Sequence, residues 1–300
     1  LIIPIKYKAD GSNRLPDTSD EQMKDLKKLL YSMYPVSKVN IEIDDPLSWD
    51  KVLDPAGGGW DRLLTHIATK RLTANVDPQT YYYAMFNPEP TFGQFCYNGC
   101  VLGLSVLGGP KDVWSRASIG LGYTGYMTNS TAVHEIGHAH GREHAPCGLY
   151  GQPSDPDYPY PAGNTGVWGY DITKNKLKEP EYADFMSYCS PIWTSDYTFA
   201  GIHSRVLKVG EQRRAAPGVL TPWQRFKVDE EGVATIIDTV ELDTIPDGEP
   251  VLVDLLDEHG NKSGETTGYF FPYSHLPGGW VFAADQHPAE AALVHHFDYY

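Results

Sequence analysis

Three histidines and one glutamate occur in residues 134–144 with the spacing of a metal site. The segment reads H-E-x-x-H-x-x-G-x-x-H. On an α-helix, His134 and His138 lie four residues apart and share a face, so both imidazoles can reach one ion. Glu135 stands beside the first ligand, where it can face a water molecule on the metal without binding the metal itself.

A glycine after this helix allows a third ligand to join. Gly141 can adopt the left-handed conformation that ends a helix, and the chain then turns back and brings His144 to the same ion. Three protein ligands leave a fourth position for water, which is typical of a catalytic zinc site. His140 does not belong to this set, and we expect it in solvent or behind the ligands, on another face of the helix.

The extended pattern resembles that of the metzincins, a clan of zinc-dependent endopeptidases. That clan carries a methionine in a tight turn beneath the metal, and Met186 matches it in Asp184-Phe185-Met186-Ser187-Tyr188-Cys189. In the astacin-like and serralysin-like branches, a tyrosine two residues after this methionine reaches the zinc, and Tyr188 has that position. The resemblance implies that Tyr188 hydrogen-bonds the oxyanion formed during attack. It covers about residues 75–210, and it assigns no subfamily.

On this resemblance we expect a zinc metalloendopeptidase that acts on a protein or peptide. One catalytic Zn²⁺ is held by His134, His138 and His144, and it activates a water molecule and polarises the scissile carbonyl. Glu135 is the general base, and Tyr188 is the second catalytic residue. Two alternatives stay open: a zinc hydrolase of a non-protein substrate, and a binding protein with a vestigial site. The intact Glu135 argues against the vestigial site.

Four cysteines occur in two settings. Cys96 and Cys100 flank an Asn-Gly turn. Cys147 follows the last ligand and Cys189 follows the methionine turn, and the resemblance brings these two places together under the zinc. An even count in these settings predicts two disulfides and a secreted or extracytoplasmic protein. A four-cysteine zinc site is the competing interpretation, and it lacks the C-x-x-C spacing.

Composition limits the partners of this chain. A length of 300 residues allows one large domain or two ordinary ones. A formal net charge of −15 argues against nucleic acid, because phosphate binding needs a basic surface. No apolar run is long enough to span a membrane. We expect a monomer, and because the chain starts at leucine we expect that an upstream segment has been removed.

The segments before the motif predict the framework of the site. Strand patterns alternate with helical ones, which implies a mainly parallel, twisted sheet with helices packed on it. The predicted strands cover residues 1–8, 36–43, 80–86, 101–107 and 117–123, and the predicted helices cover residues 20–34 and 61–72. In the metzincin layout the 101–107 strand is the antiparallel edge above the cleft, where a peptide substrate adds a strand.

The predicted fold class is α/β (α+β), a metzincin-like catalytic domain with a twisted mixed five-stranded sheet and an active-site helix. A small all-β module follows, because short β-runs alternate with Asp-Gly and Pro-Gly-Gly turns after about residue 215. We therefore divide the chain into a zinc metallopeptidase domain, 1–214, and a β-sandwich-like module, 215–300. The module is expected to supply no catalytic group, and its histidines, His275 included, have no ligand spacing.

Residues 145–183 are rich in proline, glycine, aspartate and tyrosine. Ser154, Asp155, Asp157 and Asp171 offer oxygens of the kind that calcium prefers. Their spacing matches no known calcium loop, so a solvated surface insert is the favoured interpretation, and a structural Ca²⁺ is the alternative.

Overall fold

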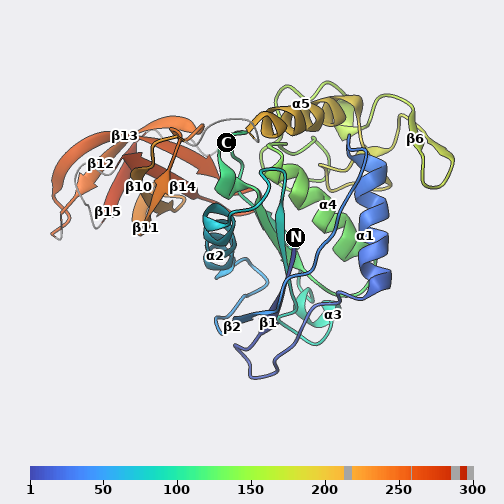
Figure 1. Ribbon diagram of the computed structural model, residues 1–300, viewed down its shortest axis with the longest axis horizontal. Helices are drawn as coiled ribbons and strands as arrows, with labels where there is room; N and C mark the ends of the chain where they lie inside the picture. The colour runs from blue at the N-terminus through green and yellow to red at the C-terminus, as the bar shows by residue number, and fades with distance from the viewer. Residues whose placement is uncertain (213–217, 258, 285–290, 296–300) are drawn as a thin grey trace.

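The chain folds into a mixed α/β region and a separate all-antiparallel β-barrel, as the computed structural model shows (Figure 1). In Figure 1 the barrel lies at one end of the long axis and the β6 segment, next to α1, lies at the other, with the sheet and α4 between them. The predicted boundary between residues 214 and 215 lies outside the described residues. The structure describes residues 1–212, 218–257, 259–284 and 291–295.

The α/β region is built on five strands in the order β2-β1-β3-β5-β4. All neighbours are parallel except β4, which pairs antiparallel with β5 at the edge. The strands are β1 (Ile2–Tyr7), β2 (Leu47–Trp49), β3 (Tyr82–Phe86), β4 (Gly103–Ser105) and β5 (Ala117–Leu121). The prediction of a mixed five-stranded sheet is confirmed, and so is the antiparallel edge strand within residues 101–107.

The predicted strand at residues 36–43 is wrong. Ile43 makes only an isolated bridge to Ile2, and the strand beside β1 is β2, further along the chain. The alternation in this segment reflects burial of side chains and not strand pairing. Its apolar side chains, Val36, Val39 and Ile41, pack at the margin of the core between α1 and α4.

Helices cover the sheet and carry the metal motif. Ser19 caps α1, where its hydroxyl accepts from the amide of Gln22, in agreement with the predicted start. The helices are α1 (Asp20–Met33), α2 (Trp60–Thr73), α3 (Phe92–Phe95), α4 (Tyr126–Ala139) and α5 (Asp196–Gln212). Between α4 and α5 lie two short pairs of strands: β6 (Gly169–Asp171) with β7 (Lys176–Lys178), and β8 (Ala183–Asp184) with β9 (Ile192–Trp193).

The C-terminal region is all-β, as predicted, but it is a closed barrel and not a sandwich. Each strand pairs with two antiparallel neighbours, so the sheet closes on itself and leaves no free edge. In barrel order the strands are β10 (Thr221–Val228), β11 (Val233–Leu242), β15 (Ala291–His295), β12 (Glu249–Leu256), β13 (Lys262–Pro272) and β14 (Gly279–Ala284).

The two regions share an apolar core at their junction. Trp114, which lies just before β5, is 1% exposed, and its ring centre is 4.6 Å from that of Phe271 and 4.7 Å from that of Phe282. Trp280 contacts it as well, with ring centres 5.5 Å apart. Aromatic contacts of this kind bury much apolar surface, so they hold the barrel against the sheet region.

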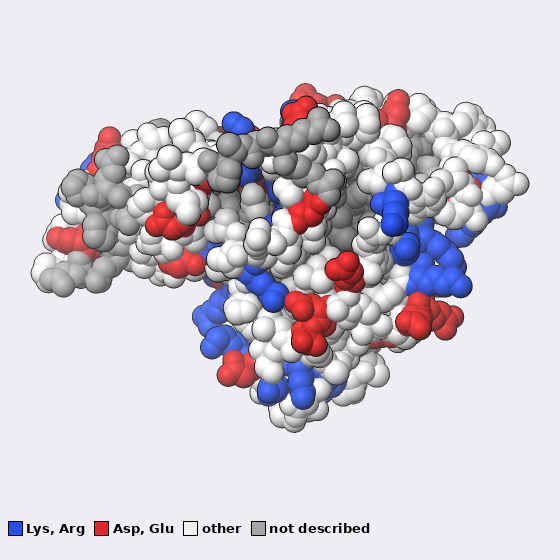
Figure 2. Space-filling view, viewed as in Figure 1, with Lys and Arg blue, Asp and Glu red and all other residues white. Residues whose placement is uncertain are grey.

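The outer surface mixes charges of both signs. Figure 2 shows acidic and basic side chains side by side over one face, with a group of basic ones at the end where α1 lies. Among the described residues, no helix is both long and apolar enough to cross a membrane.

Candidate metal centre

The metal motif lies at the end of α4 and in the turn that follows it. His140 forms the C-cap, and Gly141 has a φ of 75°, the left-handed conformation that the sequence predicted. The turn brings His144 back beside the helix. His140 itself is buried and stacks on Tyr81 with ring centres 4.0 Å apart, so it is not a solvent-exposed histidine.

The Nε2 atoms of the three motif histidines meet at one point. His138 Nε2 lies 3.0 Å from His134 Nε2 and 3.1 Å from His144 Nε2. All three side chains are buried. The spacing of the sequence therefore does bring these imidazoles together.

The tautomers of these histidines follow from their second contacts. Each Nδ1 lies beside a backbone carbonyl: 2.8 Å from Phe185 for His134, 2.6 Å from Arg142 for His138, and 3.3 Å from Pro153 for His144. A carbonyl only accepts, so each Nδ1 carries the proton and each Nε2 carries a lone pair. Three converging lone pairs repel one another unless a cation lies among them. The donor set thus fits a metal ion such as Zn²⁺.

Burial keeps these imidazoles neutral. Desolvation, with repulsion from His275, lowers the pKa of His134 to about 4. Desolvation, with repulsion from the neighbouring histidines, lowers the pKa of His144 to about 2 and that of His138 well below its ordinary value. Neutral imidazole is the form that binds metal, so at neutral pH binding has no ligand protons to displace.

Glu135 is 1% exposed and lies beside the histidine cluster. The Ser105 hydroxyl, from the edge strand β4, donates to Glu135 Oε2 at 2.8 Å. Glu135 Oε1 points to the other side, where the nearest polar atom is His275 Nε2 at 2.7 Å. The carboxylate is therefore held in place by β4 and directed toward the histidines.

The methionine turn supports α4 from below. The Asp184 carboxylate accepts from the amides of Met186 and Ser195 at 2.8 and 2.9 Å, which closes the turn. Met186 is buried, and its sulfur lies against Gly137, where an added Cβ would come within 2.3 Å of it. Only glycine at position 137 lets the turn approach α4 this closely.

Tyr188 lies at the open side of the cluster. Its hydroxyl is 3.4 Å from His144 Nε2, 2.5 Å from His275 Nδ1 and 2.7 Å from Gln152 Oε1. Burial, followed by repulsion from Glu135, raises the pKa of the phenol, so it stays protonated and can donate a hydrogen bond.

His275 is the residue that the sequence did not reveal. It belongs to the loop between β13 and β14, and it joins His134, His138 and His144 in a group whose ligand atoms all lie within 4.8 Å of one another. We expected no histidine of the C-terminal region to have ligand spacing, yet His275 joins the cluster. His275 lies 87 residues beyond Tyr188, and no local spacing links it to the motif.

The predicted disulfides are both present. Cys96 pairs with Cys100 and Cys147 pairs with Cys189, with Cα–Cα distances of 4.9 and 5.7 Å. Because all four cysteines are oxidised, a four-cysteine zinc site is excluded. The second bridge ties the His144 turn to the methionine turn. Disulfides are consistent with an extracytoplasmic protein.

Two of the carboxylates offered for calcium, Asp155 and Asp171, lie beside cationic side chains instead. Asp155 lies 3.1 Å from the Arg142 guanidinium, and Asp171 lies 3.8 Å from the Lys178 ammonium. Among the described residues, the four histidines form the one group of potential ligands that could hold an ion.

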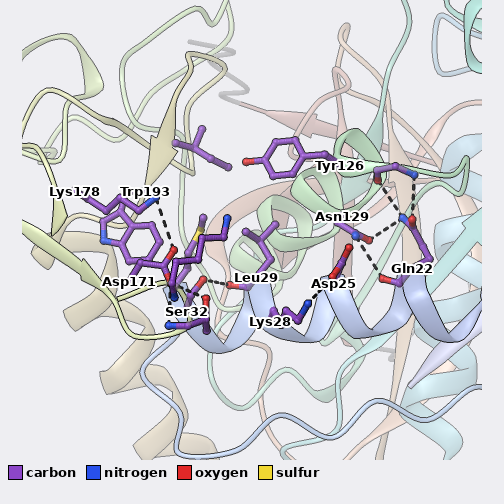
Figure 3. A pocket seen from close by; sticks show the side chains of 15 residues that line it. Gln22, Asp25, Lys28, Leu29, Ser32, Tyr126, Asn129, Asp171, Lys178 and Trp193 are labelled. Atoms are coloured by element: carbon purple, nitrogen blue, oxygen red, sulfur yellow. Dashed lines mark hydrogen bonds and ion pairs between the residues drawn. The ribbon is translucent and has the colours of Figure 1, made fainter. Parts of the chain in front are cut away.

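A separate cavity of about 340 Å³ lies between α1, α4 and the β6–β9 segment (Figure 3). On one side, the Lys178 ammonium lies 4.8 Å from the ring centre of Trp193. On another, Gln22 donates to Asn129 at 2.9 Å. No histidine of the cluster lines this cavity, so it is distinct from the metal centre.

Comparison with known proteins supports a metallopeptidase. Residues 108–202 match Peptidase M66, a metallopeptidase family. The matched segment contains α4, the His144 turn and the methionine turn, and it ends before the barrel. No curated protein matches the chain.

Proposed function

We propose that this protein is a zinc-dependent endopeptidase with a metzincin-type site. The observation that carries the proposal is the convergence of three neutral imidazoles beside a buried carboxylate, with Nε2 atoms 3.0 and 3.1 Å apart. The match of residues 108–202 to Peptidase M66 supports the same class of enzyme.

Glu135 is the general base of the proposed reaction. A zinc ion bound by His134, His138 and His144 would polarise the scissile carbonyl and lower the pKa of a water molecule. Glu135 accepts the proton of the attacking water and passes it to the leaving amine. The hydrogen bond from Ser105 occupies Oε2, so Oε1, which lies 2.7 Å from His275 Nε2, is the oxygen that takes this proton.

Tyr188 stabilises the charge that develops on the carbonyl oxygen. Its hydroxyl lies 3.4 Å from His144 Nε2, which brings it within reach of a substrate atom at the cluster. The raised pKa keeps its proton in place, so it donates to the oxyanion when that oxygen becomes negative.

The substrate is an extended peptide. β4 lies at the edge of the sheet and pairs with β5 on one side, and Ser105 at its end contacts Glu135. A peptide that adds a strand to this edge passes directly beside the base. The two disulfides support action outside the cytoplasm, and we propose that the enzyme acts as a monomer.

The test compares Glu135→Ala with Glu143→Ala, an exposed neighbour in the same motif. Each zinc-loaded protein is incubated with an unfolded protein and a peptide library, and mass spectrometry maps the fragments. We expect Glu135→Ala to retain one zinc but lose cleavage, and Glu143→Ala to cleave like the unchanged protein. Equal cleavage by both variants would reject Glu135 as the base. Turnover of esters or amides without any peptide cleavage would favour the non-protein hydrolase.

A further inference from the structure

The loop between β13 and β14 crosses from the barrel to the edge of the sheet and ends at the histidine cluster. Tyr273 forms an antiparallel bridge with Val106, just after β4. The amide of Leu107 donates to the Pro272 carbonyl at 3.1 Å, and the amide of Ser274 donates to the Ser105 carbonyl at 2.9 Å. The loop therefore extends the sheet as an added strand, along the path assigned above to the substrate.

His275 follows directly on this added strand, and its ring completes a tetrahedron. The six distances between ring centres of His134, His138, His144 and His275 run from 4.6 to 5.3 Å. Four imidazoles on one tetrahedral zinc ion, each nitrogen about 2 Å from it, place their ring centres about 5 Å apart. The ring of His275 thus occupies the fourth corner of the site.

The hydrogen bonds of His275 leave its Nε2 free to bind a metal. Gln152 Oε1 accepts from the Tyr188 hydroxyl at 2.7 Å, so the phenol oxygen accepts in turn from His275 Nδ1–H at 2.5 Å. The orientation of the Gln152 amide follows from its Nε2, which donates to the His275 carbonyl at 3.4 Å. With the proton on Nδ1, His275 Nε2 carries a lone pair.

This lone pair has no hydrogen-bond donor in front of it. His275 Nε2 is buried in a side chain that is 8% exposed, and it has no hydrogen-bond partner. Its near neighbour is Glu135 Oε1 at 2.7 Å, an acceptor of the same sign. Two acceptors at this distance repel unless a proton lies between them or a metal cation lies next to both, and the neighbouring ligand nitrogens mark the place of the metal.

We propose that His275 is a fourth metal ligand and that the loop around it keeps the enzyme latent. The regulation rests on the proposed function, whereas the ligand assignment stands without it. With His275 on the ion, the position that a catalytic zinc leaves open for water is filled. With residues 272–274 on the edge of the sheet, the substrate path is filled as well.

Release of the loop requires no separation of the two regions. Phe271 and Trp280, on either side of the loop, pack against Trp114 and remain anchored. Between them the loop is held by the backbone bonds above, by Leu276, which packs against Gly57, and by side-chain hydrogen bonds. The Ser274 hydroxyl accepts from the Ser105 amide, and His275 bonds to Tyr188 and Gln152. A competing peptide strand that displaces these contacts exposes the metal and takes up the same backbone partners.

The experiment measures metal coordination and peptide cleavage in parallel on zinc-loaded full-length protein. X-ray absorption counts the imidazoles on zinc in the unchanged protein, in His275→Ala and in His203→Ala, whose histidine is exposed on α5. We expect four imidazoles in the unchanged protein and in His203→Ala, and three in His275→Ala. Acetohydroxamate should bind the cobalt-substituted His275→Ala at least 10-fold more tightly, and kcat/KM for short peptides should rise at least 10-fold.

Each outcome decides the proposal. Three imidazoles in the unchanged protein overturn it, whether or not any variant folds. A His275→Ala protein that keeps its zinc but cleaves more slowly also overturns the latency, because His275 then assists the reaction. If His275→Ala lowers the number of imidazoles on zinc from four to three and no variant cleaves peptides, the assignment of His275 as a ligand is supported. The proposed endopeptidase activity is then rejected. If His275→Ala does not fold, as judged by near-ultraviolet circular dichroism, His275→Gln takes its place.

Discussion

The α/β region and the barrel contribute to one histidine cluster by different means. In the α/β region, a single helix and its turn carry three of the histidines, and local geometry brings them together. In the barrel, a loop carries His275, and only the docking of the two regions brings it to the same point. In a cluster assembled in this way, the histidines of the helix and its turn stay in place while His275 can move away with its loop. The number of histidines at the cluster can therefore change without unfolding of either region.

Removal of the metal should have the largest effect on cleavage, and the accompanying loss of structure should be confined to the α/β region. A chelator is expected to abolish cleavage completely, because the ion that would activate the water is removed. It should also loosen α4, because the three motif imidazoles then face one another with unshared lone pairs. Hydrogen exchange should speed up in α4, while β12, whose buried side chains Val253 and Leu255 belong to the separate barrel core, stays protected. Added Zn²⁺ should restore both cleavage and protection. Equal loss of protection in barrel and helix would mean that the two regions fold as one unit.

Tyr188→Phe removes the donor to the oxyanion without changing the shape of the ring. We expect kcat to fall by roughly 10- to 1000-fold with a small change in KM. The same substitution removes the acceptor of His275 Nδ1–H, so the loop should also be released more easily. Tyr158→Phe, at a phenol that donates to the Asn164 carbonyl, is the control. An unchanged kcat in Tyr188→Phe, with the same number of imidazoles on zinc, would assign the phenol to packing alone.

The shared core predicts that barrel and sheet region lose stability together. Trp280→Ala should cost about 3–5 kcal/mol of unfolding free energy and lower the denaturation midpoints of both regions, because Trp280 contacts Trp114. Phe226→Ala is the matched change within the separate barrel core, and it should act on the barrel first. Identical unfolding profiles for the two variants would contradict the division into two cores.

The two disulfides should differ in their contribution to stability. The chain-entropy model assigns about 4 kcal/mol to Cys147–Cys189, which spans 42 residues, and about 2 kcal/mol to Cys96–Cys100, which spans 4. Paired Cys→Ala variants, followed by chemical denaturation, measure the two values. A larger loss from the short bridge would show that strain or local packing dominates over loop entropy.

His140 should produce the smallest effect, a loss of stability in acid. Burial lowers its pKa from 6.5 to about 3, so between these values the unfolded chain binds a proton that the folded chain does not. Stability from this group is complete above pH 6.5 and falls as the pH drops, by about 2 kcal/mol between pH 7 and 5. His140→Phe keeps an aromatic ring against Tyr81 and should reduce the loss by that amount. If the pH dependence of stability is the same in His140→Phe as in the unchanged protein, another titrating group causes the loss of stability in acid.

Local features of the site were predictable because short-range geometry controls them. Helical periodicity places His134 and His138 on one face, and a glycine in the left-handed conformation returns His144, so spacing alone identifies the convergence. The helix cap at Ser19 and the antiparallel edge strand were predictable from sequence and resemblance for the same kind of reason. The strand predicted at 36–43 failed because alternation reports which side chains are buried, and the backbone there pairs with β1 only through the isolated bridge at Ile43.

The sequence by itself determined that three motif histidines converge beside a carboxylate, and together with the resemblance it predicted the pairing of the cysteines. Only the tertiary structure decided that the C-terminal strands close into a barrel, that Trp114 joins the barrel to the sheet region, and that His275 reaches the cluster. The physical reason is the range of the interactions. Spacing within a helix or turn is set by backbone geometry, whereas the position of a distant loop depends on how buried apolar surfaces fit together, and no local pattern records that fit.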